Sequence, residues 1–415
     1  MKKNFGKNFL LILVSTMLSL VAAEYIFRWM IFSKHQLFSH LKDPGLYADN
    51  PSDDYWKLYF QFDGPIKPPA NPQPLLGWGG RFDRDNYEHR YTKNAGNKRP
   101  VLIYGDSFVL CVDSVECFEE ILNNDSAFKE KNYLLNYGAP GYGVDQIYLL
   151  CSLSIKKYTN PFVVVSIMPT DMDRCMLSVR TGQKPYFTNE DGTLVLKGVP
   201  INPKPEAFFK ENPPAISSYL YSRFLHSSLN GFIHENENDK RQIICDLNEK
   251  IILKADSELK SLNVDYVFMI FDNLYNEDGD WRSEFLLKLL SRNNIPFIYT
   301  PELIFADQDF PVYDYKHYCI LGDGHPRSHY NRIVSEEIKK YVFNYPDYSK
   351  QRSLSHEVYR DTLGAAYFEK DIRLNKDWLK TVQEKATKAN VTLDSMIRLD
   401  AAWMSNERRK KGNSN

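Results

Sequence analysis

VLIYGDS, residues 101–107, is an apolar run that ends in a glycine, an aspartate and a serine. Four more apolar runs follow it, at residues 133–137, 162–168, 266–271 and 297–300. The run at 162–168 is rich in β-branched residues, as expected for a strand buried on both faces. Stretches of helical periodicity lie between and after these runs, at residues 115–123, 145–157, 281–291 and 330–343. The alternation predicts an α/β fold, a three-layer α/β/α domain with a doubly wound, parallel, five-stranded sheet.

The serine of the opening stretch lies where such a sheet binds ligands. In open parallel sheets the ligand sits outside the carboxyl ends of the strands, and Gly105-Asp106-Ser107 directly follows the first strand. A serine hydroxyl becomes a useful nucleophile only with a base within hydrogen-bonding reach. Taken alone, the tripeptide is equally typical of an ordinary turn or a helix cap.

A base and an acid occur together just before the last predicted helix, in Asp323-Gly324-His325-Pro326. The glycine lets the chain bend so that the Asp323 carboxylate accepts the Nδ1 proton of His325, which leaves Nε2 to take a serine proton. Two other interpretations are a helix cap at Asp323 with a surface histidine, and a metal site that adds His329. The metal site would need a further strong ligand with a spacing signature, and none is evident. We therefore predict no metal and no other cofactor.

A glycine-rich segment, Asn136-Tyr137-Gly138-Ala139-Pro140-Gly141-Tyr142-Gly143, follows the second predicted strand. Glycines let the backbone approach a ligand and point its amides inward, as an oxyanion hole requires. The segment does not match a phosphate loop, because it lacks Gly-Lys-Ser/Thr, and its glycine spacing differs from a dinucleotide fingerprint.

Together these three blocks resemble those of the SGNH/GDSL hydrolases, and they occur in family order across roughly residues 100–340. The resemblance implies a flavodoxin-like fold and a catalytic triad. Ser107 would be the nucleophile, His325 the base and Asp323 the acid that orients it. Gly141 and the amide of Ser107 would donate hydrogen bonds to the oxyanion.

One further block departs from the family pattern. The family's Gly-x-Asn-Asp after the third strand reads Met168-Pro169-Thr170-Asp171 here, so Thr170 replaces the asparagine of the oxyanion hole. A threonine hydroxyl donates one hydrogen bond but reaches less far than an amide, and losing one such donor costs on the order of 10²–10³ in turnover. Asp171 matches the pattern. We expect it to hold the serine loop, as a supporting residue alongside Asp106.

The N-terminus predicts a membrane segment. Lys2, Lys3 and Lys7 precede an apolar run over residues 9–23, and the apolar pattern resumes after Ala23 and continues to Phe32. We favour an uncleaved anchor; the alternative is a signal peptide cleaved after Val21-Ala22-Ala23. The basic flank places the N-terminus in the cytoplasm and the bulk of the chain outside, in the periplasm or at the cell surface. Cleavage would make the protein a secreted one.

We expect the chain to divide linearly. After the anchor, residues 1–32, a Pro- and aromatic-rich linker over 33–98 is predicted to be irregular and to pack onto the domain edge. The hydrolase-like domain spans 99–345 and carries an insertion at 174–262. The insertion opens with a hairpin at 186–196 and is predicted to form a lid or binding wall. A helical appendage over 346–415 closes the chain.

Composition excludes some classes of function. The 52 basic and 53 acidic side chains give a formal net charge of −1, which removes the electrostatic argument for a nucleic-acid partner. The six cysteines contain no Cys-x-x-Cys pair, and disulfide pairing cannot be read from their spacing. We expect buried free thiols at these positions, which are Cys111, Cys117, Cys151, Cys175, Cys245 and Cys319.

These observations predict a membrane-anchored, extracytoplasmic serine esterase. Its expected partners are an acyl-ester or carbohydrate substrate, from which it removes a short acyl group such as acetyl, and the membrane through the N-terminal helix. One alternative is an acyltransferase that passes the acyl group to a cell-surface glycan. The other is a non-catalytic glycan-binding or assembly protein, with which Thr170 is compatible.

Overall fold

The computed structural model describes residues 5–50, 52–63, 69, 71–112, 114–228, 237–272, 274, 280–307, 309, 315–350, 368–369, 372–373, 375–389 and 391–412. The chain forms two compact units, and both are discontinuous in sequence. Unit 1 joins Met1–Gly79 to Met172–Lys250, and unit 2 joins Gly80–Asp171 to Ile251–Asn415.

Unit 2 contains a five-stranded sheet in which every neighbouring pair is parallel. The strand order is β4-β3-β5-β8-β9, the order of a flavodoxin-like, doubly wound sheet. The five-stranded parallel sheet is therefore as the sequence predicts. Its strands are β3 (Arg99–Tyr104), β4 (Asn132–Asn136), β5 (Phe162–Ile167), β8 (Asp265–Ile270) and β9 (Phe297–Tyr299).

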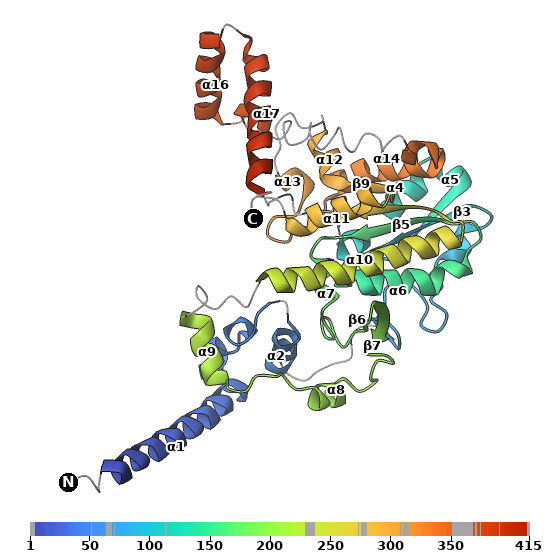
Figure 1. The fold of residues 1–415 in the computed structure, drawn as a ribbon. Coiled ribbons are helices and arrows are strands. Elements are labelled where there is room, and N and C mark those ends of the chain that lie inside the picture. The colour runs from blue at the N-terminus through green and yellow to red at the C-terminus, as the bar shows by residue number, and fades with distance from the viewer. Residues whose placement is uncertain are drawn as a thin grey trace. The chain divides into compact units, whose positions relative to one another are not determined.

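Helices cover both faces of this sheet (Figure 1). On one face lie α4 (Phe118–Asn124) and α14 (Ser328–Asn344), and on the other lie α6 (Val144–Ser154) and α10 (Glu237–Ser261). Helix α11 (Trp281–Arg292) connects β8 to β9. Because both faces are covered, the middle of each strand is a continuous apolar run, and polar residues such as Arg99, Asn132 and Asp265 occur at strand ends.

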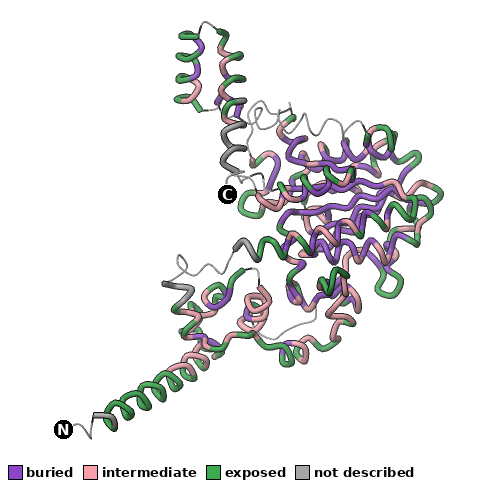
Figure 2. The backbone as a smooth tube through the Cα atoms, viewed as in Figure 1, coloured by how far each residue is buried: buried purple, intermediate pink, exposed green. Residues whose placement is uncertain are grey.

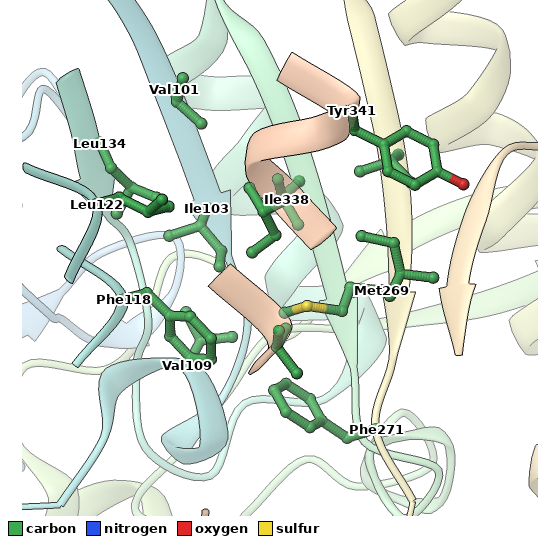
Figure 3. Packing of buried hydrophobic residues seen from close by; sticks show 14 of the residues in the cluster. Val101, Ile103, Val109, Phe118, Leu122, Leu134, Met269, Phe271, Ile338 and Tyr341 are labelled. Carbon is green, nitrogen blue, oxygen red and sulfur yellow. The ribbon is translucent and has the colours of Figure 1, made fainter. Parts of the chain in front are cut away.

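One apolar core cluster of unit 2 lies between the sheet and the α4/α14 layer (Figure 3). Val101 and Ile103 of β3 are completely buried against Phe118 of α4 and Ile338 of α14. Figure 2 shows the central strands buried, with the exposed residues on the outer surfaces of the helices. This packing fixes β3, and with it the loop that carries Ser107, in the middle of a rigid layer.

Unit 1 contains the N-terminal helix and most of the predicted insertion. Its main elements are α1 (Phe5–Phe32), α2 (Asp53–Asp63), the hairpin of β6 (Tyr186–Glu190) and β7 (Thr193–Lys197), α8 (Pro205–Glu211) and α9 (Tyr219–Ser228). The hairpin turns at Asp191 and Gly192, which both have positive φ, as a two-residue turn of this kind requires. That hairpin and its turn are as the sequence predicts.

Two expectations about the 33–98 segment need revision. The segment contains α2, an 11-residue helix, so the prediction of irregular structure was wrong there. The prolines that indicated a linker lie after this helix, whose first turn holds two aspartates, a favourable placement at a helix N-terminus. The segment also splits between the units, because residues 33–79 belong to unit 1 and residues from Gly80 belong to unit 2. Likewise, the end of α10 belongs to unit 2 from Ile251 onward.

The remaining described elements are short or terminal. Near the C-terminus, α16 (Lys376–Ala389) and α17 (Leu393–Gly412) pack around a small apolar cluster of their own. Thr392 caps α17 by accepting a hydrogen bond from Ser395 N at 3.1 Å. Residues 351–367 of the predicted appendage lie outside the described part of the chain. The short elements are η1 (Gln36–Leu41), η2 (Pro44–Leu46), β1 (Pro72–Gln73), β2 (Gly77–Trp78), η3 (Thr92–Ala95), α3 (Ser107–Leu110), α5 (Phe128–Lys131), η4 (Ile155–Lys157), α7 (Asp171–Arg174), α12 (Thr300–Phe305) and α13 (Tyr315–Tyr318).

The N-terminal helix is apolar and exposed. Within the 26-residue stretch Lys7–Phe32, the most apolar 18-residue window has a mean hydropathy of 2.1 and no buried share, so the stretch is long and apolar enough to cross a membrane. Figure 2 shows it exposed over most of its length. The helix runs without a break through Ala23, so the apolar pattern after that residue belongs to the same helix.

Candidate active site

Ser107 lies on a tight turn from a strand into a helix. It is the first residue of α3, directly beyond the carboxyl end of β3. The buried Asp106 caps this helix, because its Oδ1 accepts a hydrogen bond from Phe108 N at 2.9 Å. A Cβ on Gly105 would lie 2.6 Å from Cγ2 of Val109, so only glycine allows the turn to be this tight. The turn presents Ser107 at the edge of the sheet where ligands bind.

A disulfide closes the loop that follows Ser107. Cys111, which ends α3, is bonded to Cys117, which begins α4. The expectation that all six cysteines are free thiols was therefore wrong for this pair. The chain turns back at Cys111, which has a φ of 62°, and spacing alone does not indicate such a turn. The other four cysteines remain thiols; Cys151, Cys175 and Cys319 are buried and Cys245 is partly buried.

Asn136, at the end of β4, joins the serine helix to the glycine-rich loop. Its Nδ2 donates to the Val109 carbonyl at 2.8 Å, and its Oδ1 accepts from Gly138 N at 2.9 Å. A Cβ on Gly138 would lie 2.5 Å from Leu110 N, so the two loops approach each other backbone to backbone. Gly141, in the same loop, has a φ of +74°, a conformation that favours glycine.

Asp323 and His325 form the hydrogen-bonded pair that the sequence predicts from their spacing. Nδ1 of His325 lies 2.8 Å from Oδ1 of Asp323. Gly324, between them, has a φ of +85°, which lets the two side chains turn toward each other. Nε2 of His325 is buried, and no described residue forms a hydrogen bond with it. The imidazole is therefore oriented through one nitrogen and available through the other.

The histidine loop reaches the serine helix through Phe108. The ring centroids of Phe108 and His325 lie 4.8 Å apart. Because Phe108 follows Ser107 in the chain, this contact brings the imidazole to the first turn of α3. Sequence reasoning did not single out Phe108, since a contact between positions more than two hundred residues apart has no local signal.

The disulfide loop also contacts the helix that follows His325. Glu116 N donates to Oγ of Ser328 at 2.9 Å, and Nδ2 of Asn331 donates to the Glu116 carbonyl at 3.0 Å. The same Asn331 amide lies 3.6 Å from Sγ of Cys111. These contacts join the segments that carry the serine and the histidine.

Thr170 occupies an exposed turn at the carboxyl end of β5. The turn is held by Asp171, whose Oδ2 accepts from Met168 N at 2.9 Å and whose own N–H donates to the Met168 carbonyl at 2.8 Å. Asp171 is completely buried. These bonds fix the turn on which Thr170 lies, next to β3 in the sheet.

The histidines proposed as alternative metal ligands separate in the structure. His325 is bonded to Asp323, whereas Nε2 of His329 is 2.8 Å from Oδ2 of Asp307. Asp307, Asp309 and His329 each bring one possible ligand atom within 4.8 Å of the others. Tyr318 donates to the same Asp307 oxygen at 2.9 Å, so hydrogen bonds account for this arrangement.

His89, which sequence reasoning missed, is bonded to the backbone of Asn136, the residue that joins the serine helix to the glycine-rich loop. Its Nε2 donates to the Asn136 carbonyl at 2.9 Å, and its Nδ1 accepts from Tyr91 N at 3.2 Å. Burial disfavours the charged imidazole and lowers the pKa of His89 to about 4. The side chain is therefore a neutral structural histidine beneath the loop that Asn136 begins.

Comparisons with known proteins yield similarity at the level of solved structures. No family model matches the chain, and no curated protein matches it in sequence. Two crystal structures of catalytic mutants of an acetylxylan esterase from Geobacillus stearothermophilus cover 60% of this chain and 95% of their own. Their TM-scores are 0.33 and 0.34, with sequence identities of 15% and 13%.

Proposed function

We propose that this protein is a serine esterase of the SGNH/GDSL type that removes a short acyl group, such as acetyl, from a carbohydrate ester. The observation that carries the proposal is the hydrogen-bonded pair of Asp323 and His325, which lies against Phe108 beside Ser107. The strand order is that of a doubly wound parallel sheet, and such sheets bind ligands beyond the carboxyl ends of their strands. Ser107 lies at such a position, directly after β3, and this supports the proposal.

In the proposed reaction, Oγ of Ser107 attacks the acyl carbonyl carbon while Nε2 of His325 takes the hydroxyl proton. Asp323 accepts the Nδ1 hydrogen bond and stabilises the imidazolium that forms. The tetrahedral intermediate collapses, and the alcohol leaves with the proton from His325. Water then attacks the acyl-enzyme by the same route and releases the carboxylic acid. No cofactor takes part.

The proposed oxyanion hole combines backbone and side-chain donors. The N–H of Ser107 belongs to the first turn of α3, where amides have no acceptor within the helix. The N–H of Gly141 and the hydroxyl of Thr170 complete the set. Thr170 lies on the turn that Asp171 holds, so the backbone position from which its hydroxyl extends is fixed. Preorganised donors of this kind stabilise the charge that develops on the carbonyl oxygen.

The proposed location is outside the cytoplasm, with α1 as the membrane anchor. The length and hydropathy of Lys7–Phe32 support a membrane span. The disulfide between Cys111 and Cys117 supports an oxidising compartment, because such bonds are rare in reducing cytosol. Acyl esters of surface or exported carbohydrates are the substrates that such an enzyme would meet.

A serine-directed fluorophosphonate, applied to the full chain in detergent, tests the proposal. We expect labelling of the wild type and none of Ser107→Ala. Labelling of His325→Gln should be slower by at least about 10²-fold, because the hydroxyl loses its base. Thr170→Val should slow turnover of a soluble acetyl ester by on the order of 10²–10³, whereas Thr170→Ser keeps the hydroxyl and should be close to wild type.

Ser291→Ala provides the matched control, since Ser291 lies exposed near the end of α11. Equal labelling of wild type and Ser107→Ala would refute the assignment of the nucleophile. Labelling without release of free acid, combined with transfer of the acyl group to an added sugar, would make the protein an acyltransferase that uses the same site. A folded wild type that is not labelled would favour the non-catalytic glycan-binding alternative.

A further inference from the structure

The last turns of α1 are built into unit 1. Ile31 of α1 is completely buried in an apolar cluster with Tyr47, Leu58 and Tyr219. The ring of Phe27 also contacts Tyr47, with centroids 6.2 Å apart. The end of the candidate membrane span is therefore a structural part of unit 1, and no flexible tether separates the two.

Glu24 fixes the start of α9 to this part of α1. Its carboxylate accepts hydrogen bonds from Ser218 Oγ at 2.8 Å, Tyr219 N at 2.9 Å and Leu220 N at 3.0 Å. A carboxylate is a favourable cap for a helix N-terminus, since it meets unpaired amides and the positive end of the helix dipole. The first turn of α9 thus lies at the level of Glu24 along α1.

Arg28 completes the joint between the two helices. Its Nε donates to Glu24 at 2.7 Å, and its Nη2 donates to the Ser217 carbonyl at 2.8 Å. The guanidinium also lies over the ring of Tyr219, 4.9 Å from the ring centroid. Because both charges are paired and hydrogen-bonded, this ion pair is compatible with a position at the edge of a membrane.

The distance along α1 from Lys7 to Glu24 is close to the thickness of the hydrocarbon core of a membrane. The helical rise places Glu24 about 26 Å from Lys7 along the axis of α1. The hydrocarbon core of a bilayer is about 30 Å thick. If the basic residues before the span lie at one surface, then Glu24 and the first turn of α9 lie at the other.

Exposed aromatic and apolar side chains surround this level. Tyr221 and Phe224 are each 60% exposed, and they share one face of α9 because they are three residues apart. Further strongly exposed side chains come from the end of α1 and from η1. We call the whole set the aromatic collar; its members are Tyr25, Trp29, Leu37, Tyr221 and Phe224.

We infer that the aromatic collar inserts into the headgroup region of a phospholipid bilayer, so that α9 is an interfacial helix and unit 1 is seated on the membrane surface. Aromatic side chains are enriched at this depth, where the ring is buried and polar groups reach water. The collar is continuous with the membrane-spanning stretch of α1, through the joint of Glu24 and Arg28. The inference does not depend on the proposed esterase activity.

Fluorescence from single sites in the full-length protein tests this inference. Cysteine is introduced by Tyr221→Cys or Phe224→Cys in a Cys245→Ser background, because Cys245 is the thiol that is not buried. The variants are labelled with nitrobenzoxadiazole and reconstituted in vesicles of phosphatidylcholine and phosphatidylglycerol. We expect blue-shifted emission, and stronger quenching by lipids with a nitroxide at acyl carbon 5 than at carbon 12.

Asp191→Cys, at the exposed turn of the β6–β7 hairpin, is the control and should give water-like, unquenched emission. Water-like emission at positions 221 and 224 would overturn the inference. Labels that are shielded in native membranes but exposed in pure lipid vesicles would also overturn it, in favour of a protein partner on this face. Circular dichroism confirms that each variant is folded, and both substituted side chains are exposed enough for truncation to be tolerated.

Discussion

Both ring nitrogens of His89 are engaged in a way that only the neutral imidazole allows. Nε2 carries the proton that bonds to the Asn136 carbonyl, and Nδ1 must be unprotonated to accept from Tyr91 N. Protonation would break the second bond and place a charge in a buried site. Since Asn136 holds the serine helix and the glycine-rich loop together, the protonation state of His89 affects the packing beneath the candidate active site.

We predict that His89 makes the protein less stable in acid. The pKa of His89 is about 4 in the folded protein and about 6.5 in an unfolded chain. The unfolded chain therefore binds a proton that the folded protein excludes, so the free energy of unfolding falls as pH drops from about 6.5 to 4. The loss from this group is about 3 kcal/mol when complete. Urea unfolding of the full chain in detergent at several pH values measures it.

The variant His89→Gln should have lower stability at pH 7 but a weaker dependence on pH in this window. The matched control is His40→Gln, because it makes the same substitution at an exposed histidine on η1. All three proteins contain the same carboxyl groups, so the comparison is made at the histidine positions alone. An unchanged pH dependence in His89→Gln would show that folding does not lower the pKa of His89, which contradicts the prediction.

At the level of single residues, sequence reasoning predicted what local spacing encodes. Asp323, Gly324 and His325 are adjacent, so the bend that joins the acid to the base could be predicted from the glycine between them. Phe108 and the disulfide could not, because both depend on how distant or turning segments meet. Whether the predicted side chains act as a triad awaits the labelling experiment.

Among the elements, α3 is a very short helix, and its first residue is the proposed nucleophile Ser107. It has four residues, fewer than an isolated helix needs for stability, so its conformation depends on its neighbours. Asp106 caps its start, Asn136 holds its Val109 carbonyl, and Cys111 closes its end. The orientation of Ser107 is thus set from three sides.

We predict that the double variant Cys111→Ser/Cys117→Ser slows fluorophosphonate labelling of Ser107. The disulfide closes a short loop, and its removal should cost about 2 kcal/mol of folding stability. Labelling rates and urea unfolding, with and without a reductant, measure the two effects. Cys245→Ser is the control, since that thiol belongs to unit 1 and lies outside the site. Wild-type labelling in the double variant would show that Asp106 and Asn136 suffice to hold α3.

The strands were predicted to within about two residues, and the helices less well. Strands buried on both faces have continuous apolar sequences, so the ends of β5 and β8 lie within one residue of the ends of the apolar runs. Helix α10 begins at Glu237, before its apolar periodicity starts, because its first turns are polar. Helix α2 was missed since the prolines that follow it dominated the composition of its segment.

For the molecule as a whole, the sequence indicated a linear series of parts, whereas the compact units are interleaved. Contacts that build unit 1 join positions more than one hundred residues apart. Asp53, for example, accepts a hydrogen bond from Ser178 N at 2.7 Å. Periodicity and composition describe neighbours in the chain, so they carry no information about pairings of this range. The expected hydrolase-like domain over 99–345 remains a proposal about function.

We predict that a chain truncated after Lys350 keeps the labelling rate of Ser107 within about two-fold. The pair α16 and α17 has its own apolar cluster, built from Phe368, Ile372, Val382, Ile397 and Ala401. The truncation keeps Tyr348, whose hydroxyl donates to Glu337 of α14 at 2.8 Å. Labelling and thermal unfolding of the truncated chain test this. A large decrease in the labelling rate or in the unfolding temperature would show that the C-terminal helices stabilise the unit that contains the sheet.

The disulfide that follows Ser107 has a consequence for when the proposed active site is complete. A newly made chain in a reducing cytosol carries two thiols at Cys111 and Cys117. The disulfide, one of the three contacts that hold α3, is then still absent. In the proposed topology, the bond closes only after the segment beyond α1 reaches an oxidising compartment. Export would then also complete the candidate active site. Before export, the protein would have a less well ordered Ser107 and would hydrolyse esters inside the cell more slowly.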